Sequence, residues 1–271
     1  MKKNLEYLHR KKQTANKITM LTCYDYPTAR MQEAAGLDVI FVGDSVGPNE
    51  LGYNHEVEVS LDDILHHLKA VRRGVEHAYL LADLPFGTYD SPEAALIAAR
   101  KLIEHGADGV KLEGLEDKVV AHLTRHGIEV WGHLGYNPQR HEKAAVQGKT
   151  FDTAKALVED AISLQHAGAR MMVLELVPEE LAKLMTEQLS IPTIGIGAGR
   201  FTDGQVLIVH DLLGLTPRQF RHAKSYGHVG ERMLQAFRDY AREVEEGLFP
   251  EPVHARKMQE NELMKIKAHF N

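Results

Sequence analysis

The chain has 271 residues, with 32 Lys and Arg against 38 Asp and Glu for a net charge of -6, and it contains a single cysteine, Cys23. This acidic balance gives no overall attraction for nucleic-acid phosphates or anionic lipid. One cysteine also excludes an internal disulfide and a zinc site built from paired cysteines. The basic start has no apolar signal stretch, and no apolar run reaches the roughly 18 residues of a membrane span. We therefore predict a cytoplasmic protein that acts on small molecules, without nucleic-acid or membrane partners.

Eight short apolar runs alternate with longer segments of helical spacing. Most runs carry successive apolar residues, as strands that are covered on both faces do in parallel sheets. The predicted strands are residues 18–24, 39–43, 79–84, 109–112, 129–132, 170–174, 192–196 and 205–209. Helices are predicted at residues 61–75, 91–105, 151–167 and 178–189, the second with Pro92 just inside its start.

The strand spacing predicts an α/β fold in the form of a (β/α)8 TIM barrel. The strand starts at residues 18 and 205 enclose seven intervals of about 27 residues, close to what such a barrel requires. Residues 197–204 are too few for a full helix between the last two strands. Further helices are expected near 217–224 and 230–246. No linker or repeat divides the chain, so we predict a single barrel domain over residues 1–271, with a short basic N-terminal segment (1–17) and a charged C-terminal extension (254–271).

Polar residues follow the predicted strands at their carboxyl ends, where such a barrel builds its chemistry. They are Asp25, Asp44, Ser45, Asp83, Lys111, Glu113, His133 and Glu175. Asp44, Asp83 and Glu113 follow three consecutive strands, so they would meet at one rim and repel one another. A hard cation such as Mg2+ relieves that repulsion. The alternative for each acid is a helix cap or an arginine partner.

Three further residues at these ends are candidates for substrate binding or proton transfer. Lys111 and Glu113 are two residues apart on one strand and point to the same side, so Lys111 can hold a substrate carboxylate or support an oxyanion. Its alternative role is an ordinary ion pair. Glu175 ends the apolar run MMVLE and is a candidate general base, or a cap for the next helix. His133 ends a strand, whereas most of the 16 histidines are expected on the surface.

Several catalytic motifs are present only in part. The run GDSVG from Gly43 to Gly47 matches the nucleophile elbow of serine hydrolases, but residues 48–52 are predicted to form a loop where an elbow enters a helix. A P-loop would need a glycine at the position of Lys143. The glycines of residues 195–199 lack dinucleotide-binding spacing, and no H-E-x-x-H run occurs.

Seven motifs occur between Thr22 and Gln205, within a match to a known family that runs in order from about residue 18 to about residue 250. They are TCYDYP from Thr22, VGDS from Val42, LADLPF from Leu81, VKLEG from Val110, GHLG from Gly132, IGIGAG from Ile194 and DGQ from Asp203. Together they resemble the 3-methyl-2-oxobutanoate hydroxymethyltransferase family, also called ketopantoate hydroxymethyltransferases. The resemblance implies a barrel of the phosphoenolpyruvate mutase/isocitrate lyase type.

The resemblance also implies an activity. These enzymes transfer a one-carbon unit from the co-substrate 5,10-methylenetetrahydrofolate to 3-methyl-2-oxobutanoate, giving ketopantoate (2-dehydropantoate) for pantothenate and coenzyme A synthesis. The metal is Mg2+, with other divalent cations possible. A Mg2+-bound 2-oxo acid has a more acidic adjacent C–H, and the metal stabilises the enolate that forms. A homo-oligomer, specifically a decamer, is implied as well.

Site roles follow from the same resemblance. Asp44 and Asp83 would ligate Mg2+ at the substrate, with Glu113 in or beside the coordination shell. Ser45 and Lys111 would hold the substrate carboxylate. The catalytic residues would be Glu175, as the base, and His133, as a hydrogen-bonding group.

Two loops depart from the family pattern, at residues 48–50 and 136–145. Both would lie near the substrate, so a paralogue that uses another 2-oxo acid stays open. A second alternative is a Mg2+-dependent 2-oxo-acid C–C lyase or decarboxylase. Such enzymes usually carry a catalytic cysteine in a mobile loop, whereas Cys23 falls in the first predicted strand. A third alternative is a catalytically silent barrel that acts as a binding subunit.

Overall fold

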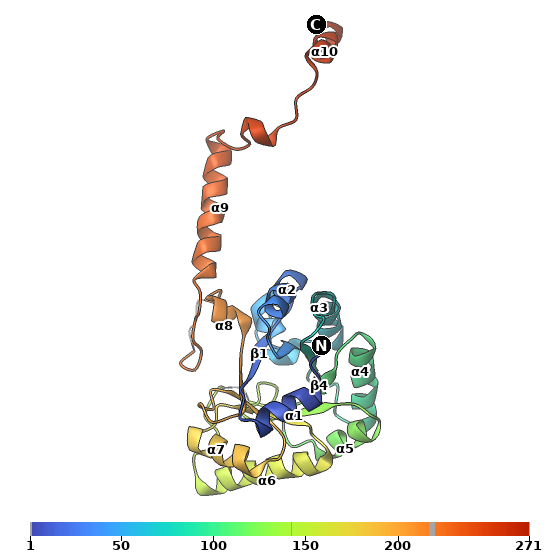
Figure 1. Cartoon of the computed structure of the whole chain (residues 1–271), viewed down its shortest axis with the longest axis vertical. Coiled ribbons are helices and arrows are strands. Elements are labelled where there is room, and N and C mark those ends of the chain that lie inside the picture. The colour runs from blue at the N-terminus through green and yellow to red at the C-terminus, as the bar shows by residue number, and fades with distance from the viewer. Residues whose placement is uncertain (1, 142, 217–219, 271) are drawn as a thin grey trace.

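The computed structural model describes residues 2–141, 143–216 and 220–270, and its centre is a closed barrel of eight parallel strands in chain order (Figure 1). The strands are β1 (Ile18–Thr22), β2 (Val39–Val42), β3 (Tyr79–Asp83), β4 (Gly109–Lys111), β5 (Val130–Gly135), β6 (Met171–Glu175), β7 (Thr193–Ile196) and β8 (Gly204–Leu207). Pairing of Ile18 with Gly204 closes the ring between β1 and β8. The barrel predicted from strand spacing is confirmed.

Several strands end at other residues than predicted, because backbone pairing and the apolar runs do not stop at the same residue. The first predicted strand overshoots, because the chain leaves the ladder after Thr22 and Asp25 then caps the next helix. The fifth is longer than predicted, because its pairing with β6 continues until Gly135 lies opposite Glu175. Hydropathy therefore located the strands but not their last residues.

Six helices cover the outside of the barrel. They are α2 (Tyr26–Ala34), α3 (Leu61–Gly74), α4 (Pro92–Glu104), α5 (Asp117–Arg125), α6 (Phe151–Ala167) and α7 (Glu179–Gln188). Four begin at side chains that accept a hydrogen bond from the first helical turn, namely Asp25, Ser60, Ser91 and Thr150. The four predicted outer helices are confirmed within one residue at each end. Asp25 is therefore a helix cap, which was the alternative given for each acid.

Short elements surround the carboxyl ends of the strands. They are a π-helical turn η1 (Gly47–Leu51), a 3-10 turn η2 (Glu56–Glu58) and α8 (Val209–Leu213), with η3 (Pro252–His254) farther along the chain. The prediction of a loop over residues 48–52 is wrong, because Pro48 lies in the first turn of η1, where a missing N–H costs nothing. Gly52, with a φ of 70°, ends the turn.

Two connections near the C-terminal half of the barrel test further predictions. Residues 197–203 join β7 to β8 without a helix, as predicted. In the helix predicted at 217–224, residues 217–219 lie outside the described residues, and the described residues 220–224 form a turn and irregular chain. That part of the prediction is wrong, because the segment lies against the barrel, where Phe220 and His222 line a cavity.

The strands are apolar on both faces because two separate cores lie on either side of the sheet. Val39 and Phe41 of β2 belong to the cluster inside the barrel, whereas Ile40 and Val42 belong to the cluster between sheet and helices. Successive side chains of a strand point to opposite faces. This alternation explains the uninterrupted apolar runs of the sequence.

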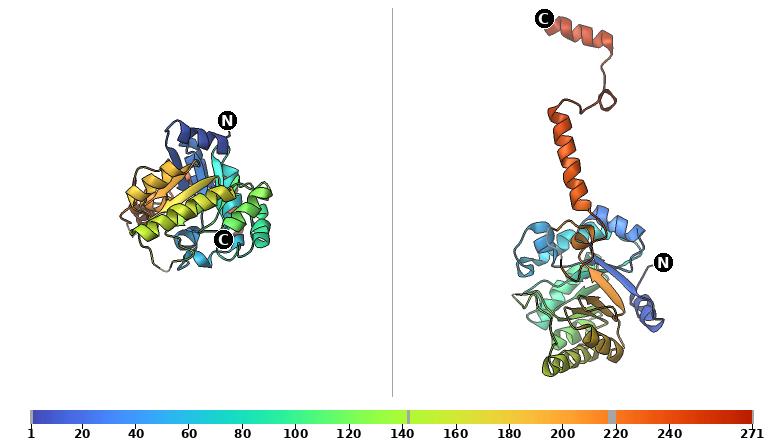
Figure 2. Two further views of the ribbon diagram at one scale, coloured as in Figure 1. Left: turned by 90° about the horizontal axis from the view of Figure 1, so that it is seen from below. Right: turned by 90° about the vertical axis from the view of Figure 1, so that its left-hand side faces the viewer.

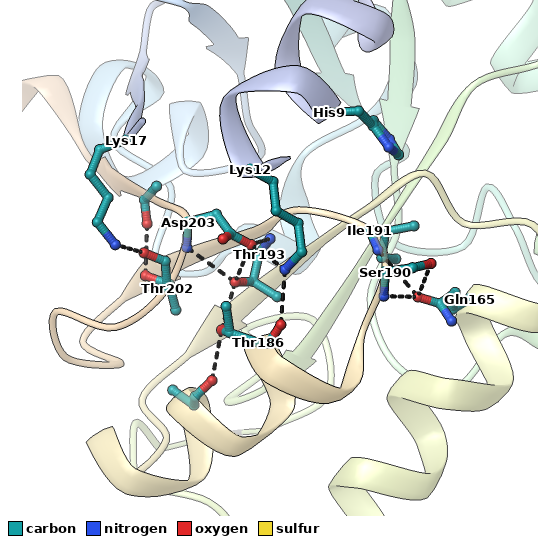
Figure 3. Close-up of polar contacts among 12 residues, drawn as sticks. His9, Lys12, Lys17, Gln165, Thr186, Ser190, Ile191, Thr193, Thr202 and Asp203 are labelled. Atoms are coloured by element: carbon teal, nitrogen blue, oxygen red, sulfur yellow. Dashed lines mark hydrogen bonds and ion pairs between the residues drawn. The ribbon is translucent and has the colours of Figure 1, made fainter. Parts of the chain in front are cut away.

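Helix α1 (Leu5–Gln13) lies beside the amino ends of the strands, in the segment that was predicted only to be basic. Leu5 and Leu8 are buried against the inner cluster. Lys12 Nζ donates to the carbonyl oxygen of Thr186 and to Asp203 Oδ2, both at 2.8 Å (Figure 3). The basic residues of this segment therefore attach the helix to the barrel.

Two helices at the C-terminus project away from the barrel (Figures 1 and 2). They are α9 (Val229–Glu245) and α10 (Glu260–Phe270). The first confirms the helix predicted at residues 230–246 within one residue. Throughout the described ranges, no helix combines the length and the apolar character that a bilayer span requires.

Asp38 ties α1 to the barrel through several contacts at once. It accepts hydrogen bonds from Tyr7 Oη at 2.8 Å and from the Thr19 backbone N–H at 2.9 Å, and it pairs with Lys3 and Lys11. Burial raises the pKa of Asp38, but Lys11 and the hydrogen-bond donors outweigh burial and lower the pKa to about 2.

We predict that Asp38→Asn lowers the free energy of unfolding by about 2 kcal/mol at pH 7, because the lowered pKa measures the preference of the folded state for the charged form. This stabilisation is complete above the unfolded-state pKa near 4, and it disappears as the pH falls through about 2. Urea unfolding of both proteins between pH 7 and pH 3 measures the difference. A difference that stays constant over this range would contradict the prediction.

Candidate active site

A cavity of about 660 Å³ opens at the carboxyl ends of the strands. Seven residues that the sequence predicted as site residues line it, namely Asp44, Ser45, Asp83, Lys111, Glu113, His133 and Glu175. Each lies within the last residues of its strand or shortly after it. The parallel barrel brings these ends to one rim, so residues far apart in the sequence surround one space.

A buried ion pair lies at the centre of the site. Lys111 Nζ is 2.6 Å from Asp83 Oδ1 and 3.7 Å from Glu113 Oε1, and all three side chains are nearly inaccessible to solvent. Burial lowers the pKa of Lys111, but the negative charges of Asp83, Glu113 and Asp44 outweigh burial and raise it above its ordinary value. The ammonium group is therefore charged at neutral pH.

His133 connects two glutamates. Its Nδ1 lies 3.1 Å from Glu113 Oε1, and its Nε2 lies 3.3 Å from Glu175 Oε2, as an ion-pair contact without the alignment of a hydrogen bond. Burial lowers the pKa of His133, but the charge of Glu113 and the contacts with both glutamates outweigh burial and raise the pKa to about 9. The imidazole is therefore a cation between two carboxylates at neutral pH.

The two glutamates differ in environment. Burial raises the pKa of Glu113, but His133 and Lys111 outweigh burial and lower the pKa to about 2. Glu113 is thus ionised at neutral pH, and its side chain is only 1 % exposed. The side chain of Glu175 is 16 % exposed and faces the cavity. Of the two, Glu175 is the more accessible to a bound molecule.

Gly135 positions Glu175. It has a φ of 99°, and a Cβ at this position would lie 2.1 Å from the carbonyl oxygen of Glu175. The same carbonyl accepts a hydrogen bond from the Tyr136 backbone N–H at 2.8 Å. The chain can therefore turn out of β5 directly beside the end of β6 only because residue 135 is a glycine.

Gln139 is a site residue that sequence reasoning missed. Its Nε2 donates to Asp44 Oδ2 at 2.7 Å, and its backbone N–H donates to Glu113 Oε2 at 3.0 Å. It is almost fully buried, although it belongs to the loop of residues 136–145 that was predicted to lie near the substrate. The only sequence signal was a glutamine after Pro138, which does not reveal contacts with acids so distant in the sequence.

Ser45 is held by a tyrosine. Its Oγ lies 2.8 Å from the hydroxyl oxygen of Tyr24, which is fully buried. A serine nucleophile needs an adjacent general base, which is a histidine in the serine hydrolases with a nucleophile elbow. A helical turn follows Ser45, as in a hydrolase elbow. The side chain that contacts the Ser45 hydroxyl is a tyrosine, however, and not the histidine of a hydrolase.

The site contains more carboxyl groups than basic groups. The carboxylates of Asp44, Asp83, Glu113 and Glu175 face the two cations described above. Burial raises the pKa of Asp44 well above its ordinary value, and the charges of Asp83 and Glu113 add to this effect. Added positive charge at this point would therefore stabilise the ionised site.

The donor set fits a hard divalent cation in its chemistry, because oxygen ligands from carboxylates suit Mg2+. In the described part of the chain, no three or more His, Cys, Asp or Glu side chains are arranged as a finished metal site. Asp83 and Glu113 instead contact Lys111 and His133. A bound cation would therefore replace Lys111 and His133 as the partner of these carboxylate oxygens.

Comparison with known proteins agrees with this geometry. The family model described as ketopantoate hydroxymethyltransferase matches residues 2–252. The chain belongs to this family. A 3-methyl-2-oxobutanoate hydroxymethyltransferase of Thermotoga sp. (strain RQ2) is 47 % identical over 93 % of this chain and 96 % of the relative. Another, from Bacillus cereus (strain AH187), is 43 % identical over 98 % of each chain.

Solved structures share the predicted barrel fold. A phosphonopyruvate hydrolase in complex with oxalate and Mg++ superimposes with a TM-score of 0.62 at 12 % identity, covering 100 % of this chain and 97 % of the other. A 2,3-dimethylmalate lyase, described as a PEP mutase/isocitrate lyase superfamily member, gives a TM-score of 0.59 at 14 % identity, with 100 % of both chains covered. At these identities the likeness concerns the fold.

We predict that Lys111→Met lowers the free energy of unfolding by about 3–5 kcal/mol without added divalent cations, because it leaves Asp83 and its acidic neighbours without their cation. The control is Lys155→Met, which removes an exposed lysine 2.7 Å from Glu159 and should cost no more than about 0.5 kcal/mol. Urea unfolding measures both. A Lys111→Met protein as stable as the wild type would show that the pair does not stabilise the site.

Proposed function

We propose that this protein transfers a hydroxymethyl group from 5,10-methylenetetrahydrofolate to 3-methyl-2-oxobutanoate, giving ketopantoate for pantothenate and coenzyme A synthesis. The names of relatives that are 43 % and 47 % identical over nearly the whole chain support the reaction. The structural observation that carries it is the cavity-facing carboxylate of Glu175 beside the His133 cation. This arrangement suits the abstraction of a proton next to a carbonyl group.

Lys111 and Ser45 are the proposed ligands of the substrate carboxylate. Both line the cavity, and Lys111 supplies a full positive charge within it. The Tyr24 contact holds the Ser45 hydroxyl at a fixed place. Binding by these two groups orients the short 2-oxo acid with its C3 atom toward Glu175.

Glu175 acts as the base. It takes the proton from C3, and the electron pair of the broken C–H bond attacks the methylene carbon of the folate. A C–C bond forms as one of the two methylene C–N bonds of the folate breaks. Water then supplies the hydroxyl oxygen as the second C–N bond breaks, and the two folate nitrogens take up one proton from Glu175 and one from water, which releases tetrahydrofolate and ketopantoate. His133 holds Glu175 in position from one side and is itself fixed by Glu113 on the other.

Asp44 and Asp83 are the proposed residues for a divalent cation, with Glu113 in or beside its coordination shell. When bound, Mg2+ or a similar cation would stabilise negative charge on the keto oxygen as a Lewis acid. The excess of carboxylates in the cavity supports this proposal. Gln139 orients two of these acids, since it donates to both Asp44 and Glu113.

The alternatives from the sequence are less well supported. A lyase that uses a catalytic cysteine needs a reactive thiol, but Cys23 is fully buried directly after β1, and burial raises its thiol pKa to about 12. The names of the relatives favour a hydroxymethyltransferase over a silent barrel. They also favour 3-methyl-2-oxobutanoate over another 2-oxo acid.

We also propose one barrel domain in a homo-oligomer, specifically a decamer that acts in the cytoplasm. The observation behind self-association is α9, whose side chains Met233, Phe237, Tyr240 and Val244 recur at helical spacing and are all exposed. A second copy of the chain is the proposed cover for this face. Light scattering after size-exclusion chromatography tests it, and a monomeric mass would contradict it.

We predict that Glu175→Gln lowers the rate of C3 deuterium exchange in 3-methyl-2-oxobutanoate by about 100-fold or more, because the amide cannot accept the proton. NMR in deuterated water with Mg2+ measures the exchange before any folate is added. Methylenetetrahydrofolate is then added, and ketopantoate should appear only with the wild type.

The matched control is Glu179→Gln, four residues later in the chain. Glu179 pairs with Arg200 outside the cavity, so exchange should match that of the wild type. Wild-type exchange without product would overturn the proposed electrophile. Equal exchange by the wild type and Glu175→Gln would overturn the assigned base.

A further inference from the structure

The cavity continues beyond the proposed 2-oxo-acid site to the mouth of the barrel. Its volume of about 660 Å³ lies within the range of roughly 300–1,000 Å³ typical of sites for drug-sized ligands. A short 2-oxo acid held by Lys111 and Ser45 occupies only its inner end. Glu56, Tyr136 and Lys143 also line the cavity, and they mark its outer end because they are partly or fully exposed, whereas Lys111 is buried. A second, larger molecule therefore has room above the first.

Glu56 is an acid at this outer end that forms no ion pair with any residue the structure describes. It begins the turn η2 and is partly buried, whereas its chain neighbours His55 and Val57 are exposed. Among the described residues, its carboxylate pairs with no cation, and its one recorded hydrogen bond is to its own backbone N–H. A partly buried carboxylate without a donor loses free energy that a ligand with N–H donors would restore.

The surroundings of Glu56 decide which kind of ligand fits. Burial raises the pKa of Glu56, and the negative charges of Glu113 and Glu175 raise it further. A ligand carboxylate would be repelled here, so the 2-oxo acid is excluded from this end. A neutral ligand edge that presents N–H donors is what the position accepts.

Flat aromatic groups surround the same opening. The Tyr136 ring stacks on His141 with centroids 5.7 Å apart at 27°, and the Phe220 ring stacks on His222 at 5.5 Å and 28°. Glu56 and Tyr136 line the same cavity. A planar heterocycle can therefore lie against Tyr136 while its edge meets Glu56.

We propose that Glu56 binds the 2-amino-4-oxopyrimidine edge of the folate co-substrate, whose ring N–H and amino group can both donate to one carboxylate. The proposal rests on the proposed function, because it assumes a folate as the one-carbon donor. It adds the position of that donor: the ring lies at the mouth of the cavity against Tyr136, and the methylene carbon points inward to Glu175. Lys143 lies at the same opening and provides positive charge for the carboxylates of the folate tail.

The test compares two glutamates of one turn. For Glu56→Gln we expect the KM for methylenetetrahydrofolate to rise about tenfold or more, with the KM for 3-methyl-2-oxobutanoate changed less than about twofold, because only the folate loses a charged, bidentate partner. The control is Glu58→Gln. Glu58 accepts from the backbone N–H groups of Asn54 and His55 and does not line the cavity, so both KM values should match the wild type.

A ligand-side measurement needs no variant. Calorimetry should give wild-type protein a Kd about tenfold weaker for a tetrahydrofolate analogue with methyl in place of the 2-amino group than for tetrahydrofolate, since one donor is lost. The two should bind Glu56→Gln about equally.

The same measurements distinguish a failure of the proposed reaction from a failure of the assignment of Glu56. If the wild type exchanges the C3 proton but forms no product with methylenetetrahydrofolate, the proposed function fails and this inference fails with it. If the wild type forms product while Glu56→Gln keeps the wild-type KM for folate, only the inference is overturned. Equal rises in both KM values would also overturn it, because they would indicate a general distortion of the cavity.

Discussion

The buried ion pair between Lys111 and Asp83 is the interaction on which the site depends. It lies among acids that would otherwise repel one another, at a depth where water cannot screen them. The ammonium group contacts Asp83 and lies near Glu113, and Gln139 connects Glu113 to Asp44. These contacts fix the positions of the acidic side chains, and the excess of carboxyl groups over basic groups still favours the binding of a cation.

The barrel tolerates this concentration of charge because the contacts that stabilise the fold and the residues of the site lie at opposite ends of the strands. The amino ends of the strands carry the contacts of α1, where Asp38 and Lys12 attach the helix, and the two apolar clusters fill the space inside and outside the sheet. The carboxyl ends are then free to carry polar groups. Gly135 allows the chain to turn out of β5 directly beside Glu175.

Much of this arrangement could be predicted from the sequence. The strand spacing predicts the barrel, and a barrel brings residues after successive strands to one rim, so Asp44, Asp83 and Glu113 could be grouped without coordinates. The contacts of Gln139 and Tyr24 could not be predicted, because they join residues far apart in the sequence through loops of no regular period. The helix α1 was missed for a related reason: its stability comes from Leu5, Leu8 and long-range ion pairs more than from a local pattern.

The most direct test of this account is a calorimetric titration of Mg2+ into metal-free protein, with and without 3-methyl-2-oxobutanoate and at constant ionic strength. We predict binding that the 2-oxo acid strengthens, because cation and substrate would share one carboxylate-lined space, and thermodynamic linkage requires each to strengthen the other. Asp83→Asn should bind Mg2+ at least about tenfold more weakly, since it removes a charged oxygen ligand. Binding of Mg2+ that is unaffected by both the 2-oxo acid and Asp83→Asn would contradict the account.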